Sequence, residues 1–316
     1  MGTGADTRPH IPVLLDDCLR VLAPERGGIF VDCTLGAGGH AQAILDRLPD
    51  DARLLCIDQD QRAHDEAMRS GLALDPRVTL LRGNFEVAQE LLREAGVDQV
   101  DGLLADFGVS SMQLDEPGRG FSFRQDEPLR MVMDESASMD AGEWLAAVTE
   151  KELADVIYRY GEERASRRIA ARIVAARPVH TTGQLAELVC AALKRWPRPG
   201  KKHPATQVFQ ALRIAVNREL QVIEGLLEQL PALMSPGGRA AFISFHSLEH
   251  RMVKSWVNLE TKDDYGPPMA ARREPIRRRR FDSLTRKPIK PQDDECARNP
   301  RSRSAQLRAV SRLAES

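Results

Sequence analysis

The stretch Asp32-Cys33-Thr34-Leu35-Gly36-Ala37-Gly38-Gly39-His40 decides how the first part of the chain folds. It follows a short apolar run, residues 28–33, and leads into a segment with helical periodicity, residues 41–48. Glycines at such a junction let the backbone turn sharply and approach a ligand closely, beside the free N–H groups at a helix start. The pattern predicts a ligand-binding loop between a strand and a helix, with a tight turn that binds nothing as the alternative.

Asp58 ends the next predicted strand, about 20 residues beyond the first glycine of the loop. A carboxylate at this place in an alternating α/β fold can accept hydrogen bonds from both hydroxyls of an adenosine ribose. Together, the loop and Asp58 predict a ligand that contains adenosine. The alternative is a tight turn followed by a surface aspartate.

The order of the glycines favours one adenosine ligand over another. A dinucleotide-binding loop has the pattern G-x-G-x-x-G, whereas this loop reads G-x-G-G after the acidic Asp32. An acid there suits a ligand with an ammonium group and no phosphates, which describes S-adenosylmethionine. Asn84 and Phe85, after the third predicted strand, offer an amide and an aromatic ring for an adenine, unless Phe85 packs in the core. A nicotinamide-dependent oxidoreductase is the competing class of enzyme.

Short β-rich runs alternate with helical patterns over the first part of the chain, which predicts βαβ units with right-handed crossovers. The predicted strands are residues 28–33, 53–58, 78–82 and 100–106, and the predicted helices are residues 41–48, 61–70 and 86–95. This alternation predicts a parallel sheet.

The alternation stops after Asp106. Residues 107–130 have a loop composition, and a purely helical pattern follows, with Thr181 or Thr182 as a helix N-cap. A βα phase then returns. The helices predicted for the purely helical part are residues 143–149, 152–160, 163–176 and 182–193. In the returning βα phase, we predict one or two helices over residues 207–233, which end at the turn 235–238, and a further helix at 247–259. The strands predicted there are residues 239–245 and 304–312, and the segment before the last strand is basic and has a loop composition. The expected fold class is α/β: a Rossmann-like doubly wound sheet with a helical domain inserted after its fourth strand.

Composition places the chain among ordinary globular proteins. Of its 316 residues, 42% are hydrophobic and 29% are charged, which argues against disordered and fibrous classes. No apolar run approaches the ~18 residues of a membrane span, and residues 1–17 lack a signal core, so we expect a cytoplasmic protein. The scattered cysteines predict no disulfides. His246 and His250 lack a third ligand, and we expect no metal.

Charge is distributed unevenly along the chain. Residues 272–316 carry 14 Lys and Arg against 6 Asp and Glu, a local net charge of +8, although the whole chain has a net charge of -1. The densest part is Arg277-Arg278-Arg279-Arg280. A basic arm at residues 272–303 is typical of proteins that contact phosphates, and a solvated tail is the alternative.

Several blocks of sequence, in order, match a known family. They are HIPVLLD at 10–16, the loop at 34–40, DFGVSSMQLD at 106–115, RGFSF at 119–123, YGEER at 160–164, KHPAT at 202–206, FQALRIAVN at 209–217 and ISFHSLE at 243–249. In these blocks the chain resembles the bacterial ribosomal small-subunit RNA (cytosine-N4) methyltransferases. The resemblance implies S-adenosylmethionine-dependent methylation of the exocyclic N4 amine of a cytidine in the decoding region of the ribosome. It also implies cofactor contacts at Gly38, Gly39, His40, Asp58, Phe85, Asp106 and Gln113.

The chain departs from the family pattern at three residues. The family usually has PLDMRMD where this chain reads PLRMVMD at 128–134, so Arg130 replaces an acid and Val132 replaces a base. His250 replaces the usual aspartate after the last block. A polar role at these positions is therefore not carried over, whereas the cofactor loop follows the family.

The resemblance also implies how the chain is divided and what it contacts. Residues 1–112 and 206–316 form the two parts of a methyltransferase domain, and residues 113–205 form a helical insertion that recognises the substrate. The implied partner is small-subunit ribosomal RNA within a ribosomal particle, with no membrane and no metal. The oligomeric state stays open, a homodimer being one alternative.

Asp106 is the candidate catalytic residue, because it lies at the carboxyl end of the fourth strand, where such sheets place ligands. A cytosine amine is a poor nucleophile, since its lone pair is delocalised into the ring, and an acceptor near its hydrogens helps to orient it. A contact to the cofactor alone is the alternative role. Ser110 and Ser111 either donate to the base or shape a turn.

An extruded cytosine needs stacking partners and phosphate contacts. Phe121, Phe123 and Trp144 are candidates for stacking, with core packing as the alternative, and Lys201, Lys202 and His203 are candidates for phosphate contacts, with a solvated helix start as the alternative. A ribosome-assembly factor that keeps this fold without turnover is the non-enzymatic hypothesis.

Overall fold

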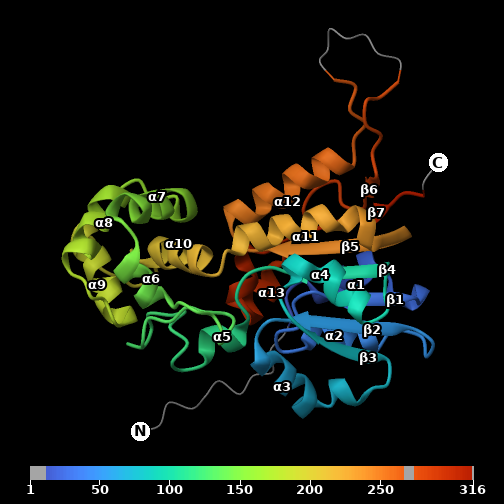
Figure 1. The fold of residues 1–316 in the computed structure, drawn as a ribbon, viewed down its shortest axis with the longest axis horizontal. Helices are drawn as coiled ribbons and strands as arrows, with labels where there is room; N and C mark the ends of the chain where they lie inside the picture. The colour runs from blue at the N-terminus through green and yellow to red at the C-terminus, as the bar shows by residue number, and fades with distance from the viewer. Residues whose placement is uncertain (1–11, 267–273, 315–316) are drawn as a thin grey trace. The chain divides into compact units, whose positions relative to one another are not determined.

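The computed structural model describes residues 12–266 and 274–314, and the chain divides into two compact units (Figure 1). The first unit comprises Met1–Gly108 and Gln221–Ser316, and the second comprises Val109–Leu220. Each unit has a hydrophobic core built from its own residues. The second unit is therefore an insertion between two parts of the first.

A seven-stranded sheet forms the centre of the first unit. Its strands lie in the order β3-β2-β1-β4-β5-β7-β6, with β7 antiparallel to β5 and β6 and the other pairs parallel. The direction of chain order reverses between β1 and β4, the place at which doubly wound sheets bind ligands. The strands are β1 (Ile29–Asp32), β2 (Arg53–Asp58), β3 (Val78–Arg82), β4 (Val100–Asp106), β5 (Met234–Ser244), β6 (Phe281–Ser283) and β7 (Gln306–Arg312).

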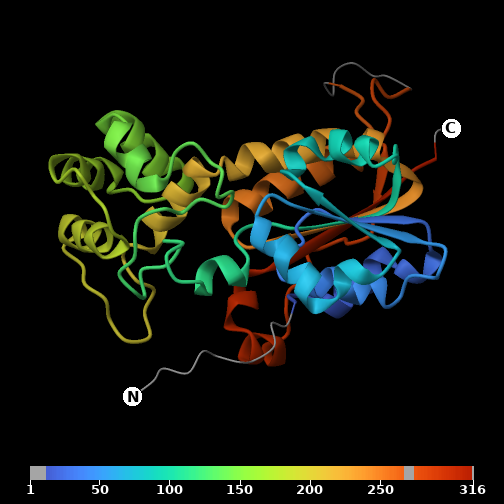
Figure 2. The ribbon, with the colours of Figure 1, turned by 60° about the horizontal axis from the view of Figure 1, so that its bottom comes forward.

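Helices cover both faces of this sheet (Figure 2). One face packs against α1 (Leu15–Leu22), α2 (Gly39–Leu45) and α3 (Gln61–Ser70). The other face packs against α4 (Ala88–Glu94), α11 (Glu219–Leu233) and α12 (Ser247–Glu260). Successive strand residues point to opposite faces, so Leu54 and Leu55, both fully buried, belong to different core clusters. Short helices complete the unit: η1 (Pro24–Arg26), η2 (Leu72–Leu74), η3 (Phe85–Val87), α13 (Asp293–Arg298) and η5 (Pro300–Ser304).

The second unit is a cluster of helices. They are α5 (Ser111–Asp115), α6 (Ala141–Ala147), α7 (Glu150–Gly161), α8 (Ser166–Ala175), α9 (Thr182–Leu193) and α10 (Thr206–Val216). Asp140, Thr149 and Thr181 each form a capping box at the start of α6, α7 and α9. These side chains satisfy backbone donors that the first turn of a helix leaves open, which explains why the helices begin where they do.

The sheet and the main helices agree with the sequence analysis, and the differences have physical causes. Of the one or two helices expected over residues 207–233, the structure has two, α10 and α11, which are separated at Arg218, where φ is 52°. The segment expected to stop that helix, residues 235–238, belongs to the irregular start of β5. The expected loops contain α5, β6 and α13.

The boundaries of the inserted unit also differ from the expected residues 113–205. Contacts place the boundaries after Gly108 and after Leu220. The largest difference is α10, which was expected in the second part of the sheet domain but packs against α7 and α6. Val208, Phe209 and Leu212 of α10 are buried in the core of the second unit, which is why this helix belongs there. Among the described residues, no helix has the length and apolar character that a bilayer crossing requires.

Candidate active site

Thr34 connects the ends of two neighbouring strands at the carboxyl edge of the sheet. Its amide and hydroxyl donate to Oδ1 of Asp32, at 3.0 and 3.3 Å, and the hydroxyl accepts from the amide of Asp106 at 2.8 Å. Asp32 ends β1 and Asp106 ends β4, which pair in the sheet. Sheet topology thus brings both carboxylates to one site, and Thr34 fixes their relative position. No pattern in the sequence separates Thr34 from an ordinary loop threonine.

Two glycines of the β1–α2 loop occupy positions that disfavour a side chain. Gly38 has φ 78°, in the left-handed region that favours glycine. At Gly39, which begins α2, a Cβ atom would lie 2.5 Å from Cγ of Pro12. A side chain is excluded at that position unless Pro12 moves. The loop therefore carries no side chain at Gly38 or Gly39, and the amide of Gly38 closes the turn by donating to the carbonyl of Leu35 at 2.7 Å.

Asp58 holds the same loop from the next strand. Its Oδ2 accepts from the amide of Gly36 at 2.9 Å, and its Oδ1 accepts from the amide of Asp60 at 2.9 Å. Burial raises the pKa of Asp58, and these two backbone hydrogen bonds oppose the shift. Each oxygen retains a second lone pair, because an ionised carboxylate has about four acceptor sites. Asp58 is thus both a clamp on the loop and an acceptor for further donors.

Asn84 and Phe85 follow β3 and have distinct surroundings. The Asn84 side chain accepts from the amide of Glu86 and donates to Gln59 Oε1, both at 2.9 Å, so its amide is used in capping η3. The half-buried Phe85 ring lies 6.0 Å from the Phe107 ring and packs on the adjoining core. One part of the Phe85 ring therefore packs against the core, and the other part is open to solvent. The side chain of Asn84 stabilises the start of η3.

Asp32 and Asp106 each have a buried carboxylate oxygen, Oδ2 and Oδ1 respectively, that has no hydrogen-bond partner among the described residues. Burial raises the pKa of Asp32 to about 6; hydrogen bonds from Thr34 oppose the shift and the charge of Asp58 adds to it. Burial also raises the pKa of Asp106 well above its usual range, and the charges of Asp32 and Glu249 raise it further.

Burying negative charge without compensating donors is unfavourable, so this edge of the sheet favours a positively charged ligand. S-adenosylmethionine carries a sulfonium and an ammonium group, and its charge therefore fits the site. A dinucleotide, whose pyrophosphate is negative, does not fit these two acids. The charge of these residues therefore favours S-adenosylmethionine over a nicotinamide dinucleotide as the ligand of the glycine loop.

His40 lies beside Asp106 at the start of α2. Its Nε2 is 3.8 Å from Oδ2 of Asp106, and the Asp106 side chain is 25% exposed while that of His40 is 9% exposed. Asp106 is therefore half-buried, with one oxygen enclosed and the remainder accessible. This combination suits a group that must contact a ligand from the open side.

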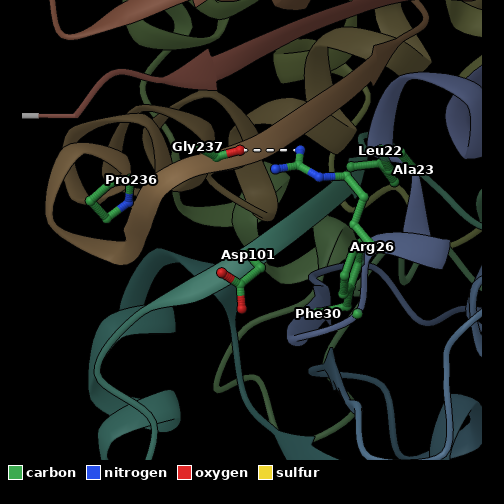
Figure 3. A pocket seen from close by; sticks show the side chains of 8 residues that line it. Leu22, Ala23, Arg26, Phe30, Asp101, Pro236 and Gly237 are labelled. Atoms are coloured by element: carbon green, nitrogen blue, oxygen red, sulfur yellow. Dashed lines mark hydrogen bonds between the residues drawn. The ribbon is translucent and has the colours of Figure 1, made fainter.

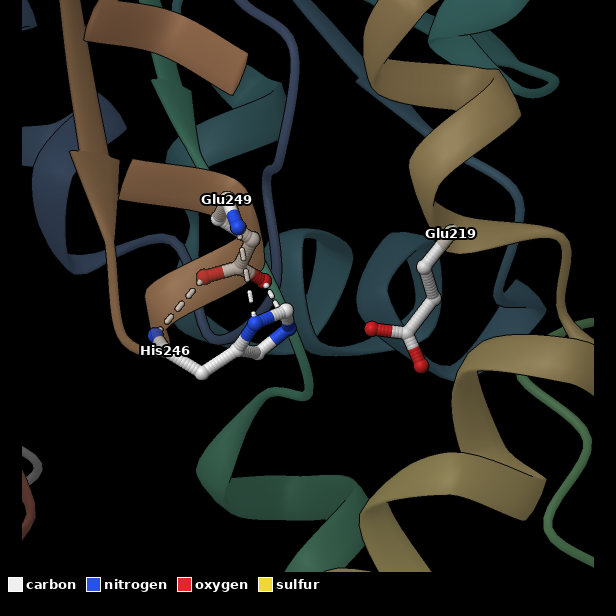
Figure 4. Close-up of side chains that lie close together, drawn as sticks. All are labelled: Glu219, His246 and Glu249. Atoms are coloured by element: carbon white, nitrogen blue, oxygen red, sulfur yellow. Dashed lines mark hydrogen bonds and ion pairs between the residues drawn. The ribbon is translucent and has the colours of Figure 1, made fainter. Parts of the chain in front are cut away.

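Glu249 is a fully buried acid that sequence reasoning did not select. Its Oε2 accepts from the amides of Phe245 and His246, at 2.6 and 3.2 Å, and its Oε1 lies 3.0 Å from His246 Nε2 (Figure 4). These contacts form a capping box in which His246 precedes α12. Figure 4 also draws Glu219 of the second unit, which accepts two hydrogen bonds from Arg213 at 2.7 and 2.8 Å.

His246 and His250, which share a four-residue spacing, have different partners. His250 Nδ1 lies 2.6 Å from Ser244 Oγ at the end of β5, whereas His246 pairs with Glu249. Burial lowers the pKa of His250, and the charge of Glu249 opposes this shift. His250 thus serves as a hydrogen-bonding side chain in place of the family's usual aspartate.

A small hollow at the opposite edge of the sheet is a separate feature (Figure 3). Arg26 donates to the carbonyl of Gly237 at 3.4 Å, while Asp101 accepts from the amide of Ile29 at 2.9 Å and from the Ser235 hydroxyl. Asp101 thereby fixes the amino ends of β1, β4 and β5 relative to one another. These hydrogen bonds stabilise the fold at this edge of the sheet, and the residues that line the hollow do not form a cluster of catalytic groups.

The sequence profile of the MraW methylase family matches residues 7–313. The chain belongs to the MraW methylase family. It is also 45% identical over 308 residues to the protein named ribosomal RNA small subunit methyltransferase H of Acinetobacter baumannii, covering 96% of this chain and 98% of that relative. Proteins of the same name from Syntrophotalea carbinolica and Thioalkalivibrio sulfidiphilus are 47% and 45% identical, covering 96% and 99% of this chain and 98% and 100% of theirs.

The residues at which the resemblance implies cofactor contacts are distributed over both units of the chain, and these contacts stay predictions. Gly38, Gly39, His40, Asp58, Phe85 and Asp106 lie in the first unit, at or after the carboxyl ends of β1 to β4. Gln113 lies in the second unit, where it is buried and its side chain accepts from the amide of Ser110 at 3.0 Å. Ser110 accepts in return from the amide of Gln113, so Ser110 caps α5 and shapes a turn. A cofactor contact at Gln113 stays a prediction.

Two departures from the family pattern lie in the second unit. Val132 is 5% exposed, and its carbonyl accepts from the buried Arg119 at 3.1 Å. The backbone of Arg130 accepts from the amide of Ala141 at 2.8 Å. The buried surroundings of position 132 explain why valine is accommodated there. Nothing in the structure explains the arginine at position 130.

The aromatic residues proposed to stack on a base have core positions. Phe121 is 8% exposed, Trp144 is half-buried against the core of the second unit, and Phe123 packs on His203 and Phe209 with ring centroids 4.4 and 4.9 Å apart. Of the two interpretations offered for them, packing in the core agrees with these contacts. His203 shares this packing, and its lowered pKa results from burial.

Three of the four consecutive arginines at 277–280 contact other parts of the first unit. Arg277 donates to the carbonyl of Leu259 at 2.6 Å, Arg279 pairs with Asp282 at 2.8 Å, and Arg280 donates twice to the buried Glu260 at 2.7 Å. Arg278 is exposed and has no such contact among the described residues. The proposed phosphate contacts of the basic arm stay a prediction, and Arg278 is the arginine of this run that is exposed without an internal partner among the described residues. Arg272 and Arg273, the first residues of the expected arm, lie outside the described residues.

Proposed function

We propose that this protein transfers a methyl group from S-adenosylmethionine to the exocyclic N4 amine of a cytidine in the decoding region of small-subunit ribosomal RNA. The observation that carries the proposal is the acidic carboxyl edge of the sheet, where buried oxygens of Asp32 and Asp106 lack partners among the described residues beside a glycine loop. The names of the curated relatives support ribosomal RNA of the small subunit as the substrate.

Each part of the cofactor has a matching residue in this proposal. Asp58 accepts from the ribose hydroxyls through its remaining lone pairs, and Phe85 contacts the adenine with its open face. Gly38 and Gly39 let the backbone approach the ligand. Asp32 stabilises the ammonium group by its charge, and the resemblance implies a further cofactor contact at Gln113. The bound cofactor supplies an electrophilic methyl group.

Asp106 is proposed to act on the cytosine amine. Its carboxylate accepts a hydrogen bond from the amine, turning the nitrogen lone pair away from the ring and towards the methyl group. Methylation makes this nitrogen cationic, and the proton it then loses passes to Asp106. The raised pKa of Asp106, caused by burial and by the neighbouring acids, makes the carboxylate a stronger proton acceptor than an exposed aspartate.

The test is methyl transfer from tritium-labelled S-adenosylmethionine to small ribosomal subunits isolated from cells that lack the modification. We expect about one labelled methyl group per subunit, recovered as N4-methylcytidine after digestion of the RNA. Subunits that already carry the modification serve as the control and should take up no label. Binding of cofactor without transfer to any subunit preparation would instead favour an assembly factor, and binding of NAD in preference to S-adenosylmethionine would favour an oxidoreductase.

We also propose that the substrate is a ribosomal particle, to which the basic segment contributes. Because Arg280 is committed to Glu260 and Arg278 is exposed, the two residues should respond differently to substitution. Arg278→Gln should lower the slope of log affinity for the subunit against log salt by about 1, since one phosphate contact is lost. Arg280→Gln should leave the slope unchanged and lower the melting temperature, because the buried Glu260 loses its partner. Equal slopes for the native chain and Arg278→Gln would remove Arg278 from the interface.

A further inference from the structure

The connection between α9 and α10 is strongly basic. Five of the nine residues at 194–202 are lysine or arginine, and none is aspartate or glutamate. They are Lys194, Arg195, Arg198, Lys201 and Lys202. The same connection contains one aromatic residue, Trp196, between Arg195 and Pro197. We call residues 194–202 the basic connection.

Every residue of the basic connection is exposed to solvent. The indole of Trp196 is 61% exposed, whereas the chain's other two tryptophans, Trp144 and Trp256, are half-buried in the cores of their units. An exposed tryptophan loses the hydrophobic stabilisation that a core position would give it. The exposed ring is therefore available to a partner molecule.

The cations of the basic connection have no partners among the residues that the structure describes. The five lysine and arginine side chains make no hydrogen bond or ion pair with other described residues, unlike Arg277 and Arg280 in the first unit. Substituting these five side chains would therefore remove no hydrogen bond or ion pair between described residues. Positive charge gathered without internal partners attracts a polyanion.

The backbone of the basic connection is restrained at both ends. Lys194 caps α9 in the left-handed conformation, and Pro197 and Pro199 have fixed φ angles. After the connection, the ring of His203 packs on Phe123, and its Nδ1 accepts from the amide of Ala205 at 3.1 Å. Restraint of this kind lowers the entropy that the segment loses when it binds a partner.

We propose that the basic connection is an RNA-binding surface, on which Trp196 stacks against an unpaired base while the surrounding lysines and arginines contact phosphates. Aromatic stacking combined with backbone neutralisation is how proteins hold single-stranded RNA. An acidic protein surface would satisfy the cations but would offer no planar partner for the indole. This inference rests on the proposed function for its RNA substrate, and assigns that recognition to particular residues.

Trp196→Ala in the full chain should reduce kcat/KM for methyl transfer to small ribosomal subunits by roughly 5- to 150-fold, the effect of losing one stacked base. Trp196→Phe should recover most of the activity, because phenylalanine keeps a stacking face. Tyr158→Ala is the matched control: Tyr158 is 59% exposed on α7 of the same unit but lies outside the basic connection. It should behave like the native chain. Affinity for S-adenosylmethionine should be the same in all four proteins.

Direct contact with RNA is measured by quenching of tryptophan fluorescence on addition of oligouridylate. Quenching should occur in the native chain and disappear in Trp196→Phe, since the remaining tryptophans are half-buried. Replacing Lys201 and Lys202 by glutamine together should lower the salt slope of oligouridylate binding by about 1.5, corresponding to two phosphate contacts on a single strand.

The results separate this inference from the proposed function. If the native chain transfers no methyl group but oligouridylate still quenches Trp196, the proposed function is wrong and the RNA-binding surface stands. If the native chain methylates subunits while Trp196→Ala has native kcat/KM, the inference is overturned. Slower methylation by Trp196→Ala with no quenching in the native chain also overturns it, because Trp196 then contacts a ribosomal protein.

Discussion

Replacing Asp106 by alanine should lower kcat about 100-fold or more, even when the cofactor is saturating. The carboxylate is proposed to contact the cytosine amine as the new bond forms, so the lost interaction belongs chiefly to the transition state. The measurement is single-turnover methyl transfer to small ribosomal subunits at saturating S-adenosylmethionine. A weaker cofactor affinity with a native single-turnover rate would show that Asp106 only holds the cofactor.

Asp106→Asn distinguishes lost catalysis from lost folding. The pKa of Asp106 is raised in the folded protein, so folding disfavours the ionised carboxylate, and this group makes the fold less stable as the pH rises from acidic to neutral values. Asparagine keeps the shape and removes the buried charge. At neutral pH we therefore expect an unchanged or higher melting temperature together with the same large fall in kcat. A melting temperature that falls in parallel with kcat would indicate structural damage instead.

Asp58→Ala should weaken binding of S-adenosylmethionine by about 10- to 100-fold, because hydrogen bonds to the ribose and the clamp on Gly36 are lost together. The demethylated product should be affected to a similar degree, since the ribose is the same in both. Isothermal titration calorimetry measures both affinities directly. Asp75→Ala is the matched control, because Asp75 precedes β3 at the other edge of the sheet and pairs with Arg77. Unchanged affinity in Asp58→Ala would remove Asp58 from the cofactor site.

Much of the arrangement of the candidate site could be predicted from sequence, because its geometry follows from local rules. Asp32, Asp58 and Asp106 end parallel strands whose apolar runs are evident in the sequence, and the carboxyl ends of parallel strands meet at one edge. The bounds of β2, β3 and β4 agree with the predicted ones for the same reason. Glycine spacing was informative because Gly39 has no room for a side chain.

The features that sequence reasoning missed depend on contacts between distant segments. Glu249 influences Asp106 only because β5 lies beside β4. Arg280 resembles its three arginine neighbours in the sequence, and only the fold reveals Glu260 as its partner. Trp196 was missed because most tryptophans are largely buried, and the sequence around Trp196 does not show that its side chain is exposed.

The position of β7 has a consequence for how the protein is made. This strand is formed from residues 306–312, yet it lies between β5 and β6 and is hydrogen-bonded to both. A ribosome synthesises a chain from the N-terminus to the C-terminus, and compact units fold as they leave the ribosome. The helical unit, Val109–Leu220, is therefore complete while the sheet still lacks an inner strand. The enzyme should acquire its cofactor site only at the end of its synthesis, and a nascent chain arrested before residue 306 should expose one side of β5 to aggregation or to chaperones.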